Sequence, residues 1–282
     1  MKCTLLLAAA CLGCLVSTHA LAWNQTMTCD NREISCNGNS PMPVHWITPC
    51  ISYYLNENGT NQMKLSDVQN VVKKSINAWN QPTRSSLQLH YSGFTNEDRV
   101  GFNPYTSLNA NIIVFRDSKW TESKAIMALT SVTHNAVTGE IYDADIEVNT
   151  ATYKFGIVEK AGKKVVDLEN TLTHEIGHTF GLAHSTVSGA TMSVYAANGE
   201  TNLRTLENDD LSAIASIYPR NGLKCHFADG YFTRPPYGMN ERPNKEEEDC
   251  SAVISRPAST PFFVWFILLA SLLGLRPIRR RL

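Results

Sequence analysis

The segment THEIGHTFGLAHS, residues 173–185, holds the residues with the clearest chemical potential in this chain. His174 and His178 are four residues apart, so on an α-helix they lie one turn apart on the same face and can bind one metal ion. Gly181 tolerates a backbone turn that most residues resist, and His184 can then return as a third ligand. Three neutral imidazoles around Zn²⁺ leave a fourth coordination position for water, which is typical of a catalytic site.

Glu175 is the residue that would use this water. It lies about 100° round the helix from His174, beside a metal rather than on it. A water bound to zinc becomes acidic near neutral pH, so Glu175 can take its proton and pass it to a departing amine. Glutamine at this position could hold the water but not accept the proton. A surface histidine cluster, or a module that binds metal without activity, is the competing interpretation of the same residues.

The sequence HEIGHTFGLAH resembles that of the metzincin zinc peptidases, and Ser185 directly after the third histidine is similar to the matrixin branch. The resemblance covers roughly residues 44–222. It implies a methionine on a tight turn beneath the zinc, and Met192 in GATMSVY fits as a hydrophobic floor that is not a ligand. It also implies protein or peptide substrates, which would add as a strand along a cleft edge at IMALTSV, residues 126–132.

Other features of the resemblance are less complete. No cysteine-switch propeptide is visible before the first predicted strand. Tyr195 follows Met192 by three residues, and we assign it no catalytic role. Asp209 and Asp210, near the start of the last predicted helix, look similar to residues of the matrixin C-terminal helix, although both could serve only the helix dipole.

Matrixins also carry a second zinc and calcium ions, and one segment offers oxygen and nitrogen ligands for them. The candidates are His134, Asp143, Asp145 and Glu147 in HNAVTGEIYDADIEVN. Carboxylates at alternating positions could bind Ca²⁺. We favour the alternative that they form the solvated face of an edge strand, because a full oxygen cage is not visible.

The elements that must position these residues follow from hydrophobic periodicity. Strands are predicted over residues 45–56, 86–94, 111–117, 126–135 and 143–149. Helices are predicted over 65–80, with Ser66 as N-cap, over about 167–183 and over 206–219. The order predicts an α/β (α+β) metzincin-like fold, in which a mixed twisted sheet carries two main helices and a small C-terminal subdomain holds one helix.

The domain organisation has five parts. Residues 1–22 are predicted to be an export signal with an Ala-Leu-Ala cleavage pattern, and residues 23–43 a disulfide-held lead-in. The zinc metallopeptidase domain is placed at residues 44–222. A linker rich in proline and acidic residues follows at 223–260, and residues 261–282 form a hydrophobic segment with an arginine cluster.

The C-terminal segment is a second targeting element. The apolar run at residues 262–275 would span about 21 Å as a helix, less than the roughly 30 Å of a bilayer core. Together with Cys250 and the arginine cluster it resembles a myxobacterial C-terminal sorting signal, which implies processing near Cys250 and attachment to the cell surface through a lipid on Cys250. A plain membrane anchor and a glycosylphosphatidylinositol signal are the alternatives. We therefore expect export to the cell surface, outer membrane or extracellular space.

Cysteine usage and charge agree with export. The cysteines that remain after removal of the signal and of Cys250 are Cys29, Cys36, Cys50 and Cys225, which suit two disulfides in any of three pairings. Charge is balanced, with 25 Lys and Arg against 26 Asp and Glu, so nothing favours a nucleic-acid partner.

The predicted function is a secreted or surface-anchored zinc endopeptidase with membrane contact through its C-terminal segment. A catalytically inactive, zinc-stabilised adhesion or binding module is the alternative. Hydrolysis of a non-peptide amide is a third interpretation.

Overall fold

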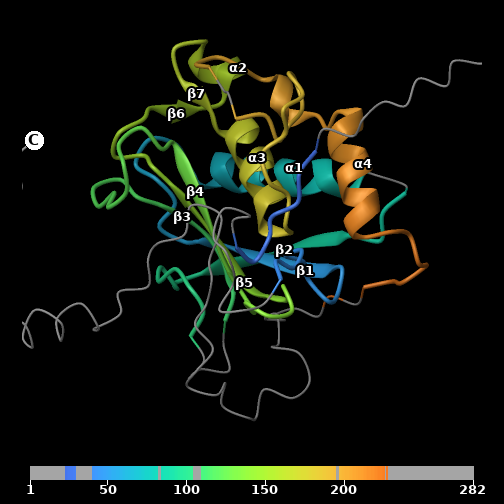
Figure 1. Ribbon diagram of the computed structural model, residues 1–282. Coiled ribbons are helices and arrows are strands. Elements are labelled where there is room, and N and C mark those ends of the chain that lie inside the picture. Colours follow the sequence, from blue (N-terminus) through green and yellow to red (C-terminus); the bar gives the residue numbers. More distant parts are fainter. Residues whose placement is uncertain are drawn as a thin grey trace, which may run out of the picture.

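The computed structural model describes residues 23–29, 40–81, 84–103, 109–194, 197–225 and 227 (Figure 1). Several predictions concern residues outside these ranges: the export signal, Cys36, Tyr195, the linker with Cys250 and the hydrophobic C-terminal segment. Within the described part of the chain, every helix is too short or too polar to span a bilayer.

A five-stranded sheet with the order β2-β1-β3-β5-β4 frames the molecule. Its members are β1 (Cys50–Asn56), β2 (Gln88–Thr95), β3 (Asn111–Phe115), β4 (Ala128–His134) and β5 (Ile141–Val148). The pairs β1–β2, β1–β3 and β3–β5 are parallel, whereas β4 runs antiparallel to β5 at the edge. The sheet is therefore mixed, which confirms the predicted fold class.

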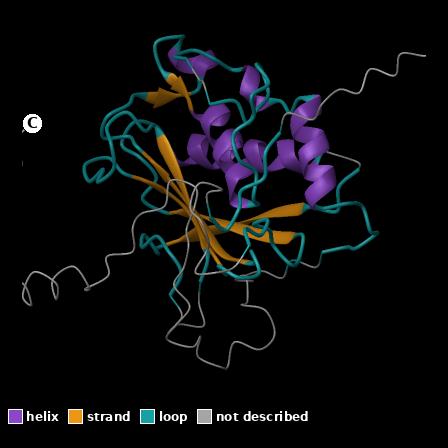
Figure 2. Cartoon of the chain, in the orientation of Figure 1, coloured by secondary structure: helices purple, strands orange, loops and turns teal. Residues whose placement is uncertain are grey.

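Helices α1 (Leu65–Asn80) and α3 (Leu168–Thr179) lie on one face of the sheet, with α4 (Asn208–Ile217) beside them (Figures 1 and 2). Helix α1 has the predicted bounds because its apolar residues recur at helical spacing and pack into the main core. Its N-cap is Lys64, without a side-chain cap, so the prediction of Ser66 was wrong.

The two faces of the sheet differ in chemistry. Successive side chains of a strand point to opposite faces. On β5, Ala144, Ile146 and Val148 join the main core under the helices. The acidic residues that alternate with them therefore point to the opposite face, where Tyr54, Ile112 and Val114 form a second, smaller cluster.

The two largest differences from the predicted element boundaries have local causes. Helix α3 ends at Thr179 rather than near Ala183, because Gly181 adopts a φ of 96° that a helix cannot continue. Strand β1 begins only at Cys50, after Pro49, which has no N–H to give to a sheet.

Four short elements were not predicted, because two to four residues are too few for a periodic pattern. They are β6 (Phe155–Gly156), α2 (Val158–Ala161), β7 (Val166–Asp167) and the 3₁₀ helix η1 (Asn202–Arg204). Arg204 fixes η1 to the start of α3, since its guanidinium donates to the carboxylates of Asp167 and Glu159. Asp167 in turn caps α3, accepting from the Asn170 N–H at 2.9 Å.

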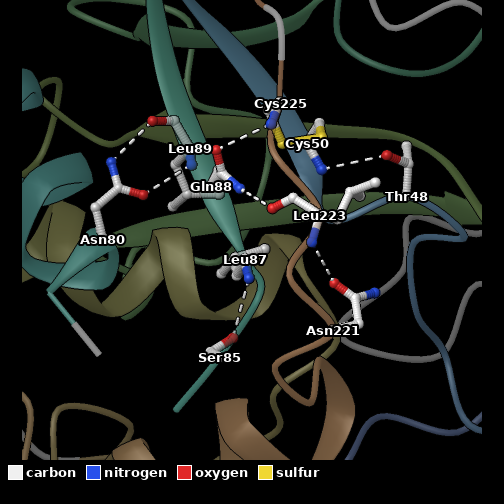
Figure 3. The surroundings of a disulfide bond; sticks show 10 residues. All are labelled: Thr48, Cys50, Asn80, Ser85, Leu87, Gln88, Leu89, Asn221, Leu223 and Cys225. Carbon is white, nitrogen blue, oxygen red and sulfur yellow. Dashed lines mark hydrogen bonds between the residues drawn. A yellow bond between two sulfur atoms is a disulfide. The ribbon is translucent and has the colours of Figure 1, made fainter. Parts of the chain in front are cut away.

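A disulfide between Cys50 and Cys225 ties the segment after α4 to the first residue of β1, with 5.6 Å between the Cα atoms (Figure 3). Gln88 reinforces this tie: its amide nitrogen donates to the Leu223 carbonyl, and its amide oxygen accepts from the Cys225 N–H. Cys29 is also disulfide-bonded. Of the three pairings left open by the sequence, only the one that joins Cys50 to Cys225 remains.

Candidate metal centre

Helix α3 and the loop that follows it bring three histidines together, a set called here the histidine cluster: His174, His178 and His184. One ring nitrogen from each lies within 4.8 Å of the others. His174 and His178 come from successive turns of α3, and their Nε2 atoms are 3.1 Å apart. Two ring nitrogens at that distance need a cation or a shared proton between them.

The outer nitrogens of the two helical histidines are held by backbone carbonyls. His174 Nδ1 contacts the Thr191 oxygen at 2.7 Å, and His178 Nδ1 contacts the Leu182 oxygen at 2.7 Å. A carbonyl can only accept, so each Nδ1 carries the proton and each Nε2 keeps its lone pair for the cluster centre. On tetrahedral zinc, with Zn–N near 2.0–2.1 Å, two nitrogens lie about 3.3 Å apart. The cluster therefore fits zinc.

The protonation of the cluster also suits a metal. Burial, and then the proximity of His174 and His184, lowers the pKa of His178 well below its usual value. Burial, and then His174, lowers the pKa of His184 to about 4. Both rings are consequently neutral at pH 7, which is the state that binds a metal.

Glu175 lies beside the cluster with its carboxylate fixed by the edge strand. The Thr130 hydroxyl of β4 lies 2.6 Å from Glu175 Oε2 and 3.1 Å from the Glu175 backbone oxygen. Burial raises the pKa of Glu175, while His174 and the Thr130 hydrogen bond oppose that rise. A carboxylate with a raised pKa and a defined direction is suited to accept and return a proton.

Met192 lies under α3 where a glycine leaves room for it. A Cβ on Gly177 would come within 2.2 Å of Met192 Sδ and 2.9 Å of Trp79 Cζ2. Met192 itself is 2% exposed and belongs to the main core. Gly177 therefore lets the methionine and the tryptophan pack directly against the helix backbone between the two helical histidines.

The loop that leads from α3 to His184 depends on a second glycine, Gly181, that packs closely against another part of the backbone. At Gly181 a Cβ would lie 2.1 Å from the Val44 carbonyl oxygen, and the φ of +96° disfavours other residues. The lead-in segment supports the same loop: Thr26 N donates to the Gly181 oxygen and Ala183 N to the Asn24 oxygen, both at 2.9 Å.

The two aspartates at the start of α4 hold the turn that carries Met192. Asp210 accepts from the backbone N–H groups of Thr191 and Met192, at 2.8 and 3.1 Å, and closes the capping box of α4. Asp209 accepts from the Ser185 hydroxyl at 2.6 Å. These side chains do more than complement the helix dipole, because they fix the backbone that positions His174 and His184.

The cluster opens into a cleft of about 200 Å³. The preceding loop and β4 form one wall, from Ala125 to Thr130, and Ser193, Val194 and Leu203 line it as well. Strand β4 is an edge strand, so its outer side is available to an added strand, in agreement with the expected cleft edge.

Three acidic residues of β5, called here the acidic row, lie elsewhere: Asp143, Asp145 and Glu147. The prediction that they form the solvated face of an edge strand was wrong, because β5 is an inner strand and they are 1%, 1% and 2% exposed. Asp143 and Asp145 line a separate cavity of about 140 Å³ with Arg99 and Gly101. His134 is buried at the end of β4 and does not line that cavity.

Three supporting residues were missed from the sequence. Thr130, Gly177 and Thr191 act through contacts with residues far away in the chain, and a threonine or glycine carries no signal of such a contact. Only Gly177 offered a weak signal in the sequence. Glycine inside a helix lowers the stability of that helix, so its presence there usually indicates close packing.

Comparison with known proteins places the chain in a family. The family model of the matrixins (Peptidase M10) matches residues 45–219. The chain is 42% identical to the metalloendoproteinase 5-MMP of Arabidopsis thaliana over 57 residues, which is 20% of this chain and 16% of that relative. It is 27% identical to 2-MMP of the same plant over 160 residues, 55% of this chain and 38% of the relative. The matches thus span less than half of each relative's length. Because the family model covers more than half of the chain, the chain belongs to the matrixin family, a family of zinc-dependent endopeptidases.

Proposed function

We propose that this protein is a zinc endopeptidase in which His174, His178 and His184 hold the metal and Glu175 moves the proton. The observation that carries the proposal is the convergence of three ring nitrogens within 4.8 Å beside a fixed, buried carboxylate in an open cleft. Zinc bound there would polarise the scissile carbonyl and acidify a water molecule.

The chain's own residues supply the remaining chemistry. Glu175 accepts a proton from the attacking water and returns it to the departing amine. Thr130 holds one carboxylate oxygen of Glu175, which leaves the other free to face the cleft. Leu182 and Thr191 keep the histidine rings oriented through their carbonyl oxygens.

The substrate would lie extended along β4. An edge strand offers backbone groups to an added strand, so a peptide can pair there and present its scissile bond to the histidine cluster. Ala128, Leu129 and Thr130 line the cleft at this place.

The test is digestion of casein by the full-length chain with Glu175→Gln as the variant. We expect the variant to bind zinc as the wild type does and to lose nearly all activity, because glutamine cannot accept a proton. The matched control is Glu169→Gln, on the same helix but outside the cleft, which should stay active. Retained activity in Glu175→Gln would refute this mechanism. Wild-type protein that binds zinc but digests nothing would favour the adhesion module, and activity confined to small amides would favour an amidase.

Export and surface attachment complete the proposal, and they rest on sequence alone. The export signal at residues 1–22 and the segment at 250–282 predict a secreted protein retained at the membrane or the cell surface. A Cys250→Ser variant should be released into the medium or left unprocessed if that cysteine is the attachment point. Unchanged retention would favour a plain membrane anchor.

Calcium stays a prediction for the acidic row. Asp143 Oδ2 has no hydrogen-bond partner among the described residues, and it lies in the wall of the smaller cavity. Hard oxygen ligands of this kind suit Ca²⁺. Calcium that raises the melting temperature of the wild type, but not of Asp143→Asn, would support the prediction.

A further inference from the structure

The cleft continues from the histidine cluster toward the N-terminal half of α3, where its lining becomes polar. Asn170 and Thr171 line this end together with Leu203. Asn170 precedes His174 by four residues, so it lies on the same helix face, about 6 Å away along the axis. That distance is within reach of a substrate side chain held next to the scissile bond.

Asn170 has an unused polar atom at this end. The residue is 2% exposed, and its amide oxygen has no hydrogen-bond partner among the described residues. Its neighbour Thr171 differs, since the Thr171 hydroxyl donates to the Asp167 carbonyl at 3.0 Å. A buried acceptor without a donor is costly, so a ligand that supplies a donor relieves that cost on binding.

The charges around this end are already neutralised. Asp167, at the base of the helix, is 1% exposed and ion-paired with Arg204. Among the described residues, the three that line this end, Asn170, Thr171 and Leu203, are neutral. A lysine or glutamate of the substrate would therefore lose its hydration here without gaining an opposite charge, which is unfavourable.

We propose that this end of the cleft selects a carboxamide side chain, glutamine before asparagine, at a residue next to the scissile bond. The proposal rests on the endopeptidase function and adds its specificity. A carboxamide offers both donors and an acceptor, and it complements the Asn170 amide in either orientation of that amide. Glutamine has the longer reach toward Asn170, and Leu203 in the same lining offers an apolar surface to its methylene groups.

The first experiment uses the full-length, zinc-loaded wild type and peptides that differ at one residue beside the scissile bond. Glutamine is compared with methionine, which has similar length without hydrogen bonds, and with glutamate, which has the same shape with a charge. We expect kcat/KM to be about tenfold higher for glutamine than for either, because an unfilled polar site rejects an analogue that lacks the donor. Equal rates, or a preference for methionine, would overturn the proposal.

The second experiment assigns the preference to Asn170. In Asn170→Leu we expect the order to reverse, with methionine cut about tenfold faster than glutamine. The matched control is Thr171→Val, which removes a hydroxyl from the same end but should keep the order glutamine over methionine, whatever its absolute rate. Reversal in both variants would show that general polarity, and not Asn170, sets the preference.

A binding measurement separates this proposal from the endopeptidase function. Fluorescence anisotropy with the zinc-loaded Glu175→Gln variant reports affinity without cleavage. Tighter binding of the glutamine peptide by about fivefold or more, with no cleavage by the wild type, would support the carboxamide site and refute the peptidase. Cleavage with no side-chain preference in rate or binding would support the peptidase and refute the carboxamide site. Because both comparisons use the Asn170 present in the natural chain, they remain decisive even where Asn170→Leu does not fold.

Discussion

The histidine cluster and the acidic row are both sets of buried ionisable groups supported by the same sheet, but they lie on opposite faces and differ in their protonation. The histidine cluster lies on the helix-covered face and opens into the larger cleft. The acidic row points to the other face, where a smaller cavity is lined by Asp143 and Asp145. The pKa values of His178 and His184 are lowered, so these two rings are neutral at pH 7, whereas the pKa values of Asp143 and Asp145 are raised.

The difference comes from where the hydrogen bonds are made. In the histidine cluster, backbone carbonyls take the outer N–H groups of His174 and His178, so the inner nitrogens are left with their lone pairs. In the acidic row, Asp145 accepts from the N–H groups of Gly101 and Ile112, but one oxygen of Asp143 accepts nothing among the described residues. Hydrogen bonds to the outer nitrogens orient the histidines as metal ligands, whereas a buried carboxylate oxygen without a donor lowers the stability of the fold.

The largest expected effect comes from removing one ligand of the histidine cluster. Loss of outer partners alone lowers metal affinity about 10–100-fold, so loss of a ligand should lower it further. We therefore expect His184→Ala to lose stoichiometric zinc, measured by mass spectrometry, and more than about 100-fold in peptidase activity. Asp143→Asn should keep both. Equal losses in the two variants would erase the distinction between the regions.

The next effect tests the packing beneath the histidine cluster. Gly177→Ala places a methyl group 2.2 Å from Met192 Sδ, so the methionine must move. Overpacking of this kind costs about 1–3 kcal/mol in the free energy of unfolding. Urea denaturation measures that loss, and zinc titration measures the expected fall in affinity.

A double variant distinguishes this clash from a general helix effect. Met192→Ala removes the side chain that the new methyl group would meet, so Gly177→Ala with Met192→Ala should cost less than the sum of the single changes. Additive losses would mean that Met192 does not constrain Gly177.

A smaller effect is expected from Thr130, which orients Glu175. Thr130→Val keeps the shape but removes the hydroxyl 2.6 Å from Glu175 Oε2, so we expect kcat to fall about tenfold with zinc content unchanged. Thr130→Ser restores the hydroxyl and should recover most of the rate. A rate for Thr130→Val equal to that of the wild type would show that Glu175 needs no support from β4.

Local patterns were sufficient to predict most elements and the placement of the three histidines. Helix α1 and the i, i+4 spacing of His174 and His178 are properties of short segments. The mixed sheet, which was predicted from the order of the elements, is confirmed. The convergence of His184 could also be foreseen, since Gly181 signals the break. The roles of these residues remain proposals for the experiments above.

Long-range contacts account for what was not predicted. Thr130 reaches Glu175 across 45 residues, and Asp210 binds the turn of Met192 through backbone groups that no side-chain pattern reports. The acidic row was misread because strand order was unknown: the alternation in DADIEV is the same for an edge strand and for an inner strand with one polar face. The position of β5 between β3 and β4 decided burial.

The last effect leaves zinc binding and peptidase activity unchanged and concerns the stability and pH dependence of the acidic row. Burial, and then the charge of Asp145, raises the pKa of Asp143 well above its usual value, and burial raises the pKa of Asp145 to about 6. In the folded state Asp143 and Asp145 keep protons that the unfolded chain releases from near pH 4. The free energy of unfolding is therefore highest at low pH, and it falls as pH rises toward and through 6. Asp143→Asn removes the repulsion, and we expect it to raise the free energy of unfolding at pH 7 by about 1–3 kcal/mol without added metal. Melting temperatures between pH 4 and 8 measure this, and the gap between variant and wild type should widen as pH rises.

Glu147→Gln is the matched control with the opposite sign, because it breaks the 2.7 Å ion pair with Arg116 and should destabilise the fold. A constant gap across the pH range would mean that Asp143 is not protonated in the folded chain, and the acidic row would then resemble the histidine cluster in having its groups satisfied.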